Sequence, residues 1–149
     1  ISACHVGLKG IKNNMIKKLI ERLLLLNTNL EDLLIALGPA ISGENYQVEF
    51  NILESIYKGF SKDMASISIT KTAVIDYMIN LNMVSLDKSP NKFLLDIRLA
   101  ASHQLYLHGI KLKQISICPY CTYKDKSHFN SWRRERIKAM QWSGITYSL

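Results

Sequence analysis

The sequence has few cysteines, few acidic residues and no long hydrophobic run. Three cysteines among 149 residues are too few, and an odd number, for the disulfide framework of a small secreted domain. We therefore expect a reducing, cytoplasmic location. The longest apolar runs are residues 23–26 and 33–37. Both are much shorter than the roughly 18–20 residues that cross a bilayer, so we expect no membrane partner.

The shortage of acidic residues makes the chain basic. Nineteen lysines and arginines oppose twelve aspartates and glutamates, which gives a net charge of +7. Such a charge favours polyanionic or phosphorylated partners, although it carries no information about the fold. The basic residues are dispersed apart from a cluster at residues 133–138, and no aromatic-interleaved motif accompanies them. Nucleic-acid binding is therefore a minor alternative.

The hydrophobic pattern alternates between strand-like and helix-like segments and predicts a layered α/β domain with a mixed sheet. The predicted strands are residues 1–5, 33–37 and 115–117, and the predicted helices are residues 11–26, 47–60, 73–81 and 94–107. Gly109 is expected to end the last helix. Residues 125–134 are expected to form a loop and a short helix, and residues 137–142 a strand that closes the sheet. We expect one truncated domain over residues 1–149, with the N-terminal part of the fold missing.

Residues 61–91 fit this pattern least well. The alternation at residues 66–70 is typical of an edge strand, whereas residues 73–81 have helical spacing. The stretch ends in a polar run, residues 87–91, that contains Pro90. We predict that the whole segment is a peripheral insertion.

Residues 5–10, His-Val-Gly-Leu-Lys-Gly, are the first candidate for chemistry. An imidazole at the end of a strand can serve as a metal ligand or a base, and a packed or hydrogen-bonded His5 is the alternative. Gly7 and Gly10 bracket Lys9 just before a predicted helix, which suits an anion site built from backbone N–H groups. An ordinary tight turn is the alternative, because the spacing is that of neither a P-loop nor a dinucleotide fingerprint.

Two further motifs lie near the C-terminus. Cys118 and Cys121 have the spacing of a redox site, but they follow a late strand instead of opening a helix, so buried thiols are expected. Arg133 and Arg134 stand beside Trp132, and arginine binds phosphate or carboxylate through two parallel hydrogen bonds. The alternative is one arginine in a structural ion pair and one in solvent.

Taken together, several collinear segments resemble the YfiH family, also called the laccase-domain or peptidoglycan-editing-factor family. The family's His-Ala-Gly-Trp-Arg-Gly corresponds to residues 5–10, and its Leu-Gly-Pro-Ala-Ile to residues 37–41. The other matching segments are residues 46–48, 94–96, 100–101, 121–123 and 129–135. The resemblance covers nearly the whole chain except residues 61–91.

The resemblance implies a YfiH-type α/β fold and a zinc-dependent purine nucleoside phosphorylase. It implies His5 as one metal ligand, with a histidine and a cysteine upstream of this segment as the others, which leaves the activity of this chain open. From charge and motif position, Lys9 and Arg133 are predicted catalytic groups that neutralise phosphate. Gly7 and Gly10 are predicted to line the phosphate site. The expected partners are a purine nucleoside, adenosine or inosine, and phosphate.

Other activities remain open. The family description also implies adenosine deaminase and methylthioadenosine phosphorylase activity. With copper in place of zinc at a site of histidine and cysteine ligands, which copper binds more tightly, the protein could be a polyphenol oxidoreductase. A non-catalytic remnant is a further alternative. Two departures from the family pattern weaken the predicted site. Leu8 replaces an aromatic residue, and Lys9 replaces an arginine and so loses its forked geometry.

Overall fold

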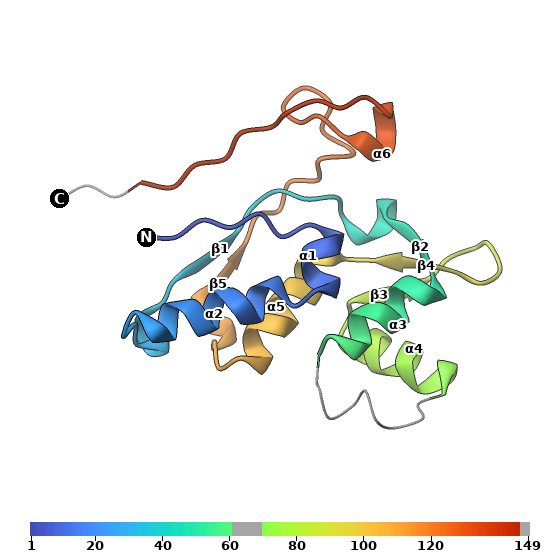
Figure 1. Ribbon diagram of the computed structural model, residues 1–149. Helices are drawn as coiled ribbons and strands as arrows, with labels where there is room; N and C mark the ends of the chain where they lie inside the picture. The colour runs from blue at the N-terminus through green and yellow to red at the C-terminus, as the bar shows by residue number, and fades with distance from the viewer. Residues whose placement is uncertain (61–69, 147–149) are drawn as a thin grey trace.

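The computed structural model describes residues 1–60 and 70–146 (Figure 1). Helices and strands are interspersed along the chain, which confirms the predicted α/β class. The elements are α1 (Leu8–Lys12), α2 (Met15–Leu25), β1 (Ile35–Leu37), β2 (Gln47–Glu49), α3 (Phe50–Lys58), α4 (Lys71–Asn80), β3 (Val84–Leu86), β4 (Lys92–Leu95), α5 (Ile97–Leu107), β5 (Ile115–Ile117) and α6 (Trp132–Glu135). None of the described helices has the length and apolar character needed to cross a bilayer.

The described strands form two small sheets, so the predicted mixture of parallel and antiparallel pairing is present but divided between them. β1 and β5 are parallel, with Ile35 opposite Ile115. An isolated parallel bridge between Ala40 and Cys121 continues this pairing into the following loops. The second sheet is antiparallel in the order β2-β4-β3. Parallel and antiparallel pairing thus both occur, but in separate sheets (Figure 1).

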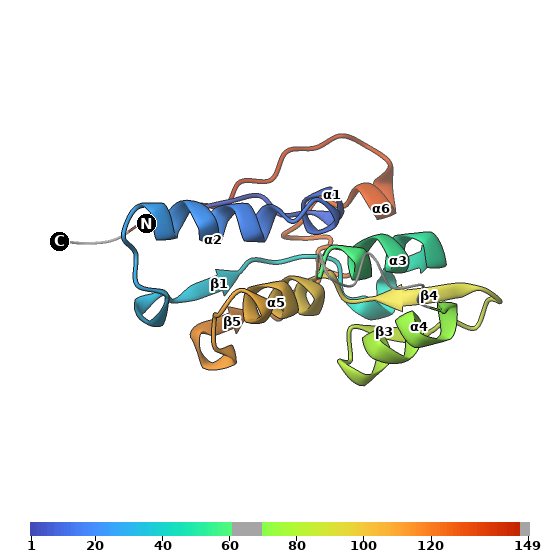
Figure 2. The ribbon, with the colours of Figure 1, turned by 60° about the horizontal axis from the view of Figure 1, so that its bottom comes forward.

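The core lies where the helices meet the antiparallel sheet. α2 packs against α5, and α1 contacts both α3 and α5 (Figure 2). The largest side chains that are completely buried are Ile11, Leu53, Ile56, Met78, Met83, Leu95, Gln104 and Ile110. They come from five of the helices and strands and from the loops beside them, and one hydrophobic cluster joins most of the described chain.

The predicted helix over residues 11–26 is two helices. α1 begins three residues earlier than predicted, at Leu8, and α2 starts at Met15. Asn14 between them has φ of 52° and ψ of 42°, a left-handed conformation that a right-handed helix cannot continue through. Because α1 begins at Leu8, Lys9 and Gly10 lie within this helix and not in the predicted loop.

Two other predicted helices begin as strands. Residues 47–60 start with β2, and residues 94–107 start within β4. In each case an acidic residue with an extended backbone, Glu49 or Asp96, is the N-cap of the helix that follows. The Asp96 carboxylate accepts hydrogen bonds from the N–H groups of Arg98 and Leu99, which satisfies donors that the first turn of a helix leaves free.

The predicted strands were only partly correct. β5 is confirmed, whereas residues 1–5 and 137–142 contain no strand. The strand predicted at residues 33–37 shortens to β1, and its side chains are half-buried or exposed instead of buried. The C-cap of α5 is His108, and the predicted cap residue, Gly109, follows directly after it. Gly109 has φ of 91°, and its N–H donates to the carbonyl of Tyr106, as in a Schellman motif.

Residues 61–91 were predicted to be a peripheral insertion. The predicted edge strand at residues 66–70 falls almost wholly outside the described residues. The predicted helix corresponds to α4. In the described part, α4 and β3 place Val74, Met78 and Val84 in the core. That the segment is a peripheral insertion relative to the family stays a prediction.

Candidate functional site

His5 lies in an extended segment that leads into α1. Its side chain is exposed, and its ring lies over Gly7, because a Cβ at Gly7 would lie 3.3 Å from Nε2 of His5. Gly7 is the N-cap of α1, and it forms no side-chain hydrogen bond to the N–H groups of the first turn. A glycine here therefore leaves room for the imidazole and leaves the N–H groups at the start of α1 free of a side-chain acceptor.

Lys9 and Gly10 occupy the first turns of α1. The Lys9 side chain is exposed. A Cβ at Gly10 would lie 3.2 Å from Cγ1 of Val6, so this glycine lets the segment before α1 pack closely against the helix. The position of Gly10 is thus explained by packing, and its predicted role in binding phosphate stays a prediction.

The described residues do not make a complete metal site. Among residues 1–60 and 70–146, no group of three histidine, cysteine or carboxylate side chains could hold a metal ion. A catalytic zinc site needs about three protein ligands. Cys4 is exposed, and its sulfur lies 3.9 Å from the carbonyl oxygen of His5. His5 therefore stays a predicted single ligand, for zinc or for copper.

Arg133 in α6 is exposed but held in place. One of its terminal nitrogens donates to the carbonyl oxygen of Gln47 at 2.9 Å. The guanidinium lies 5.0 Å from the centre of the Tyr46 ring, within the range of a cation–π contact. Burial raises the pKa of Tyr46 even though the Arg133 charge opposes the shift, so the phenol stays neutral under Arg133.

Arg134, in contrast to Arg133, is bonded mainly to other groups of the protein. Its guanidinium donates to the carbonyl oxygens of Thr122, Tyr123 and Phe129 at 2.6 to 2.8 Å. It also forms an ion pair with Glu135. Most of its donors are occupied by the protein, so Arg134 is the structural arginine that the sequence allowed as an alternative. Within the described part of the chain, its neighbour Arg133 donates to one backbone carbonyl, that of Gln47.

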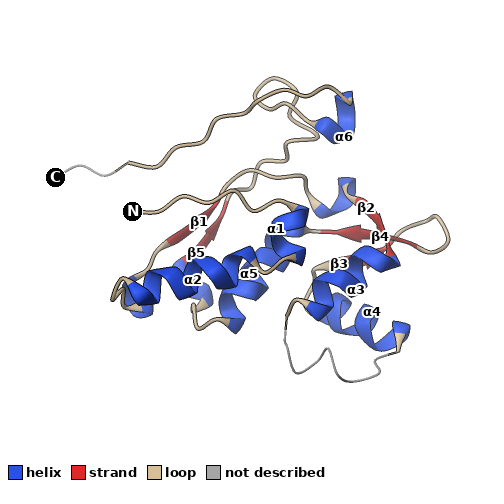
Figure 3. Ribbon diagram, viewed as in Figure 1, coloured by secondary structure: helices blue, strands red, loops and turns tan. Residues whose placement is uncertain are grey.

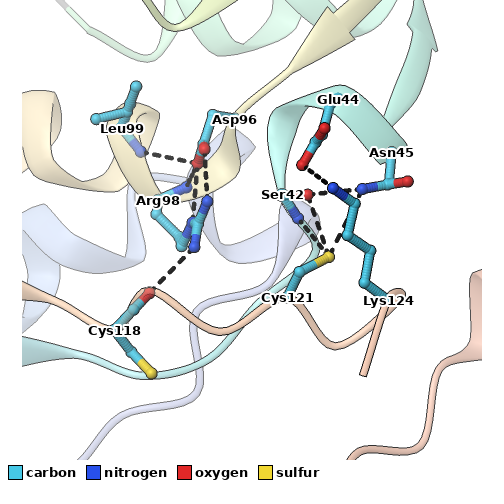
Figure 4. Close-up of polar contacts among 9 residues, drawn as sticks. All are labelled: Ser42, Glu44, Asn45, Asp96, Arg98, Leu99, Cys118, Cys121 and Lys124. Atoms are coloured by element: carbon cyan, nitrogen blue, oxygen red, sulfur yellow. Dashed lines mark hydrogen bonds and ion pairs between the residues drawn. The ribbon is translucent and has the colours of Figure 1, made fainter. Parts of the chain in front are cut away.

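A second polar cluster surrounds Cys121 (Figure 4). The thiol is 8% exposed, and its sulfur accepts hydrogen bonds from the Ser42 N–H at 3.3 Å and from the Ser42 hydroxyl at 3.1 Å. Burial acts to raise the pKa of Cys121, but these bonds and those from the N–H groups of Lys124 and Tyr123 outweigh it and lower the pKa. The prediction of buried thiols is therefore correct for Cys121, whereas Cys118 is half-buried.

Asp96 and Arg98 link this cluster to the start of α5. They form an ion pair at 2.8 Å with little exposure of either side chain. Arg98 also donates to the carbonyl oxygen of Cys118 at 3.0 Å. On the other side, Lys124 pairs with Glu44. Apart from the match of Asp96 to a family motif, no local pattern in the sequence indicated that these residues meet.

The structure keeps the two halves of the predicted phosphate site on separate elements. Within the described part of the chain, no hydrogen bond, ion pair or ring contact joins His5 or Lys9 to Arg133. Figure 3 shows α1 against the helical layer and α6 on the loops beyond the strands. Tyr46 and Gln47, which hold Arg133, were not among the predicted site residues, although they lie in a segment that matches the family.

A family model described as multi-copper polyphenol oxidoreductase laccase matches residues 1–147. The chain belongs to this laccase family. The resemblance drawn from the sequence motifs is thereby confirmed, and the match covers the segment at residues 61–91 that the motifs did not.

Curated relatives of this laccase-family chain are named purine nucleoside phosphorylases. The one from Synechocystis sp. is 36% identical over 148 residues, which are 97% of this chain and 55% of the relative. YlmD of Bacillus subtilis is 27% identical over 143 residues, 93% of this chain and 44% of the relative. The chain thus spans about half the length of the curated relatives it matches.

Two solved structures share the fold. YlmD of Geobacillus stearothermophilus gives a TM-score of 0.71 at 22% identity over 89% of this chain and 43% of that one. YfiH of Bacillus licheniformis gives a TM-score of 0.69 at 21% identity over 89% of this chain and 44% of that one. These likenesses confirm the predicted YfiH-type arrangement of helices and strands.

Proposed function

We propose that the protein catalyses the phosphorolysis of purine nucleosides, with adenosine or inosine and inorganic phosphate as substrates. The proposal rests on the similarity, over 97% of the chain, to a protein named purine nucleoside phosphorylase. In this reaction a phosphate oxygen bonds to C1′ of the ribose while the bond from C1′ to the base breaks. The base leaves with a proton, and ribose 1-phosphate is the second product.

Arg133 is the residue that we propose binds the phosphate. One of the five N–H donors of its side chain contacts the carbonyl oxygen of Gln47. The guanidinium also lies over the Tyr46 ring, 5.0 Å from its centre. The side chain is thus positioned without being saturated. A phosphate dianion would receive charge-assisted hydrogen bonds from the remaining donors. Arg134 does not share this role, because the carbonyl oxygens of three residues and Glu135 occupy it.

Lys9 is proposed as a second positive charge, presented from α1. The N–H groups at the start of α1 lack a side-chain cap, so together with Gly7 and Gly10 they are proposed to line the same phosphate site. The proposal requires Lys9 on α1 and Arg133 on α6 to contact the same phosphate.

For the metal we propose zinc, held in part by His5, with copper as the alternative. Zinc would act as a Lewis acid when bound. The described residues supply only part of the set of ligands that such a metal needs. We further propose adenosine deamination and methylthioadenosine phosphorolysis as additional activities of the same protein, and the cytoplasm as its location.

The test is base release from inosine with and without phosphate, using protein expressed from the complete reading frame. We expect hypoxanthine to appear only when phosphate is present. Arg133→Leu should raise the KM for phosphate by roughly tenfold or more, which corresponds to about 1.5–3 kcal/mol for a hydrogen bond to a charged group. Lys126→Gln removes an exposed positive charge from a turn and should leave this KM unchanged. Absence of base release under both conditions contradicts the proposal.

A second candidate is copper-dependent oxidation of polyphenols, which the description of the matching family favours. Oxygen uptake with a catechol, measured on protein whose metal content is known, separates the two activities. Copper retention together with turnover of the phenol, and no release of base, would support the oxidoreductase. A protein that shows neither activity would be the non-catalytic alternative.

A further inference from the structure

The pair Cys118 and Cys121 is the sequence motif that the proposed function does not use. We propose that these two residues form a disulfide by exchange with a small-molecule disulfide such as glutathione disulfide. We further propose that this oxidation releases the loop at residues 38–46 from residues 118–125. The unequal surroundings of the two sulfur atoms carry the proposal (Figure 4).

Cys121 is the protected member of the pair. Its sulfur accepts hydrogen bonds from the backbone N–H and the hydroxyl of Ser42. Asn45 donates to the Ser42 hydroxyl oxygen at 2.8 Å and lies 3.8 Å from the sulfur. These donors favour a thiolate, which is the nucleophilic form of cysteine. The exposed fraction of 8% keeps external reagents away from it.

Cys118 is the accessible member. It is half-buried, and its sulfur has no hydrogen-bond partner among the residues that the structure describes. Its side chain points away from that of Cys121 (Figure 4). The guanidinium of Arg98 contacts the Cys118 carbonyl oxygen at 3.0 Å. An external disulfide would therefore meet Cys118 first.

The exchange takes two steps. The Cys118 thiolate attacks one sulfur of glutathione disulfide, and a mixed disulfide forms as one glutathione thiolate leaves. The Cys121 thiolate then attacks the Cys118 sulfur and displaces the second glutathione thiolate. The protein loses two electrons and two protons in total, and glutathione disulfide gains them to become two molecules of glutathione.

Bonding to Cys118 and bonding to Ser42 compete for the Cys121 sulfur. The side chains point apart in the reduced protein, so the disulfide requires the sulfur to leave Ser42. Among the described residues, the loop is also tied to residues 118–125 by the hydrogen bonds from Thr122 N–H to Ala40 and from Cys118 N–H to Leu37, and by the ion pair of Lys124 with Glu44. Because the loop leads into Tyr46 and Gln47, which hold Arg133, oxidation would also weaken phosphate binding. That last consequence rests on the proposed function.

The experiment equilibrates the complete protein in glutathione buffers of rising disulfide content. Alkylation, proteolysis and mass spectrometry measure the disulfide within the peptide that holds Cys118 and Cys121. Hydrogen exchange measures the amides of residues 40–46, with α5 as an internal reference. We expect the disulfide and the exchange rate of residues 40–46 to rise together and to reverse with dithiothreitol, while α5 is unchanged.

Two variants sharpen the test. Cys118→Ser should keep Cys121 reduced and exchange slow over the same range of buffers. Ser42→Ala removes a hydrogen bond that stabilises the reduced form. Half of the cysteine pair should therefore be oxidised at about fivefold less glutathione disulfide, which is the shift expected from the net contribution of one hydrogen bond. The proposal is overturned if the pair stays reduced, if Cys118 stops at the mixed disulfide, or if the disulfide forms without faster exchange. None of these readouts depends on phosphorolysis, so failure of the proposed function is detected separately.

Discussion

Gln104 of α5 donates a hydrogen bond from Nε2 to the carbonyl oxygen of Ile11 at 2.9 Å. The same nitrogen lies 3.2 Å from Oδ1 of Asn14, and the residue is 1% exposed. One buried amide thus joins α5 to the point where α1 ends and α2 begins. Because α1 carries Lys9, this bond also holds part of the proposed phosphate site against the core.

Replacing this amide should destabilise the fold. Gln104→Leu removes one of the two donors to the carbonyl of Ile11, which keeps its bond from the N–H of Asn14, and should cost about 0.5–1.5 kcal/mol. Gln141→Leu, in the exposed C-terminal segment, is the matched control. Urea denaturation should show a lower free energy of unfolding for the first variant and little change for the second. Equal midpoints for Gln104→Leu and the parent protein would contradict the role given to this bond.

The left-handed conformation of Asn14 leads to a second prediction. Both Asn14→Gly and Asn14→Ala lose the contact with Gln104, but only the alanine variant must place a Cβ in a backbone with φ of 52°. That conformation costs about 1–2 kcal/mol for a residue other than glycine. The glycine variant should therefore be the more stable of the two in denaturant titrations. An alanine variant as stable as the glycine variant would mean that the break between α1 and α2 shifts to a different residue.

The ion pair of Asp96 predicts a specific pH dependence. Burial alone would raise the pKa of this carboxyl, but hydrogen bonds and the charge of Arg98, with the N–H of Leu99, lower it overall. A lowered folded pKa adds stability above the unfolded pKa of about 3.9, and this stability is lost as the pH falls through the folded value. Asp96→Asn should thus be most destabilising near neutral pH.

The measurement is the free energy of unfolding of both proteins between about pH 3 and pH 7. The difference between them should shrink as the pH falls below about 4. Asp32→Asn, at an exposed position, is the matched control. A difference for Asp96→Asn that stays constant with pH would show that the ion pair does not depend on ionisation of the carboxylate.

Arg133 and Arg134 should respond in opposite ways to substitution. Arg134→Ala leaves three backbone carbonyls without their donor and should lower the free energy of unfolding by about 1.5–3 kcal/mol. Arg133→Ala, at an exposed position, should stay within about 0.5 kcal/mol of the parent. Thermal melts of the two variants compare them directly. A large loss of stability in Arg133→Ala would mean that Tyr46 and Gln47 hold it for structural reasons.

The parts of the fold that could be predicted from the sequence are those with a local signal. Gly109 follows the C-cap of α5 because a left-handed residue is needed there, and glycine marks such positions. β2 and β4 were missed because they are only three and four residues long and run directly into helices. The apolar spacing continues across each junction, so periodicity alone does not separate strand from helix. The break at Asn14 was missed because the apolar stripe continues through it, and Gln104, which contacts it, comes from a distant helix.

In the candidate site, too, the features that depend on distant residues could not be predicted from a local signal. Arg133 and Arg134 are neighbours in the sequence, and no local pattern distinguishes the free arginine from the structural one. Their roles depend on Gln47, which is 86 residues from Arg133, and on carbonyl groups of a loop. Likewise Ser42 and Cys121 are 79 residues apart. Such pairs become visible in a sequence only through resemblance to a family, which here located the segments but not their contacts.

The proposed reaction is tested most directly by phosphorus NMR of the complete protein incubated with inosine and inorganic phosphate. Phosphorolysis predicts that the phosphate signal declines while a signal of ribose 1-phosphate grows in equal amount with free hypoxanthine. Unchanged phosphate, whether or not the base is released, would contradict phosphorolysis as the activity of this protein.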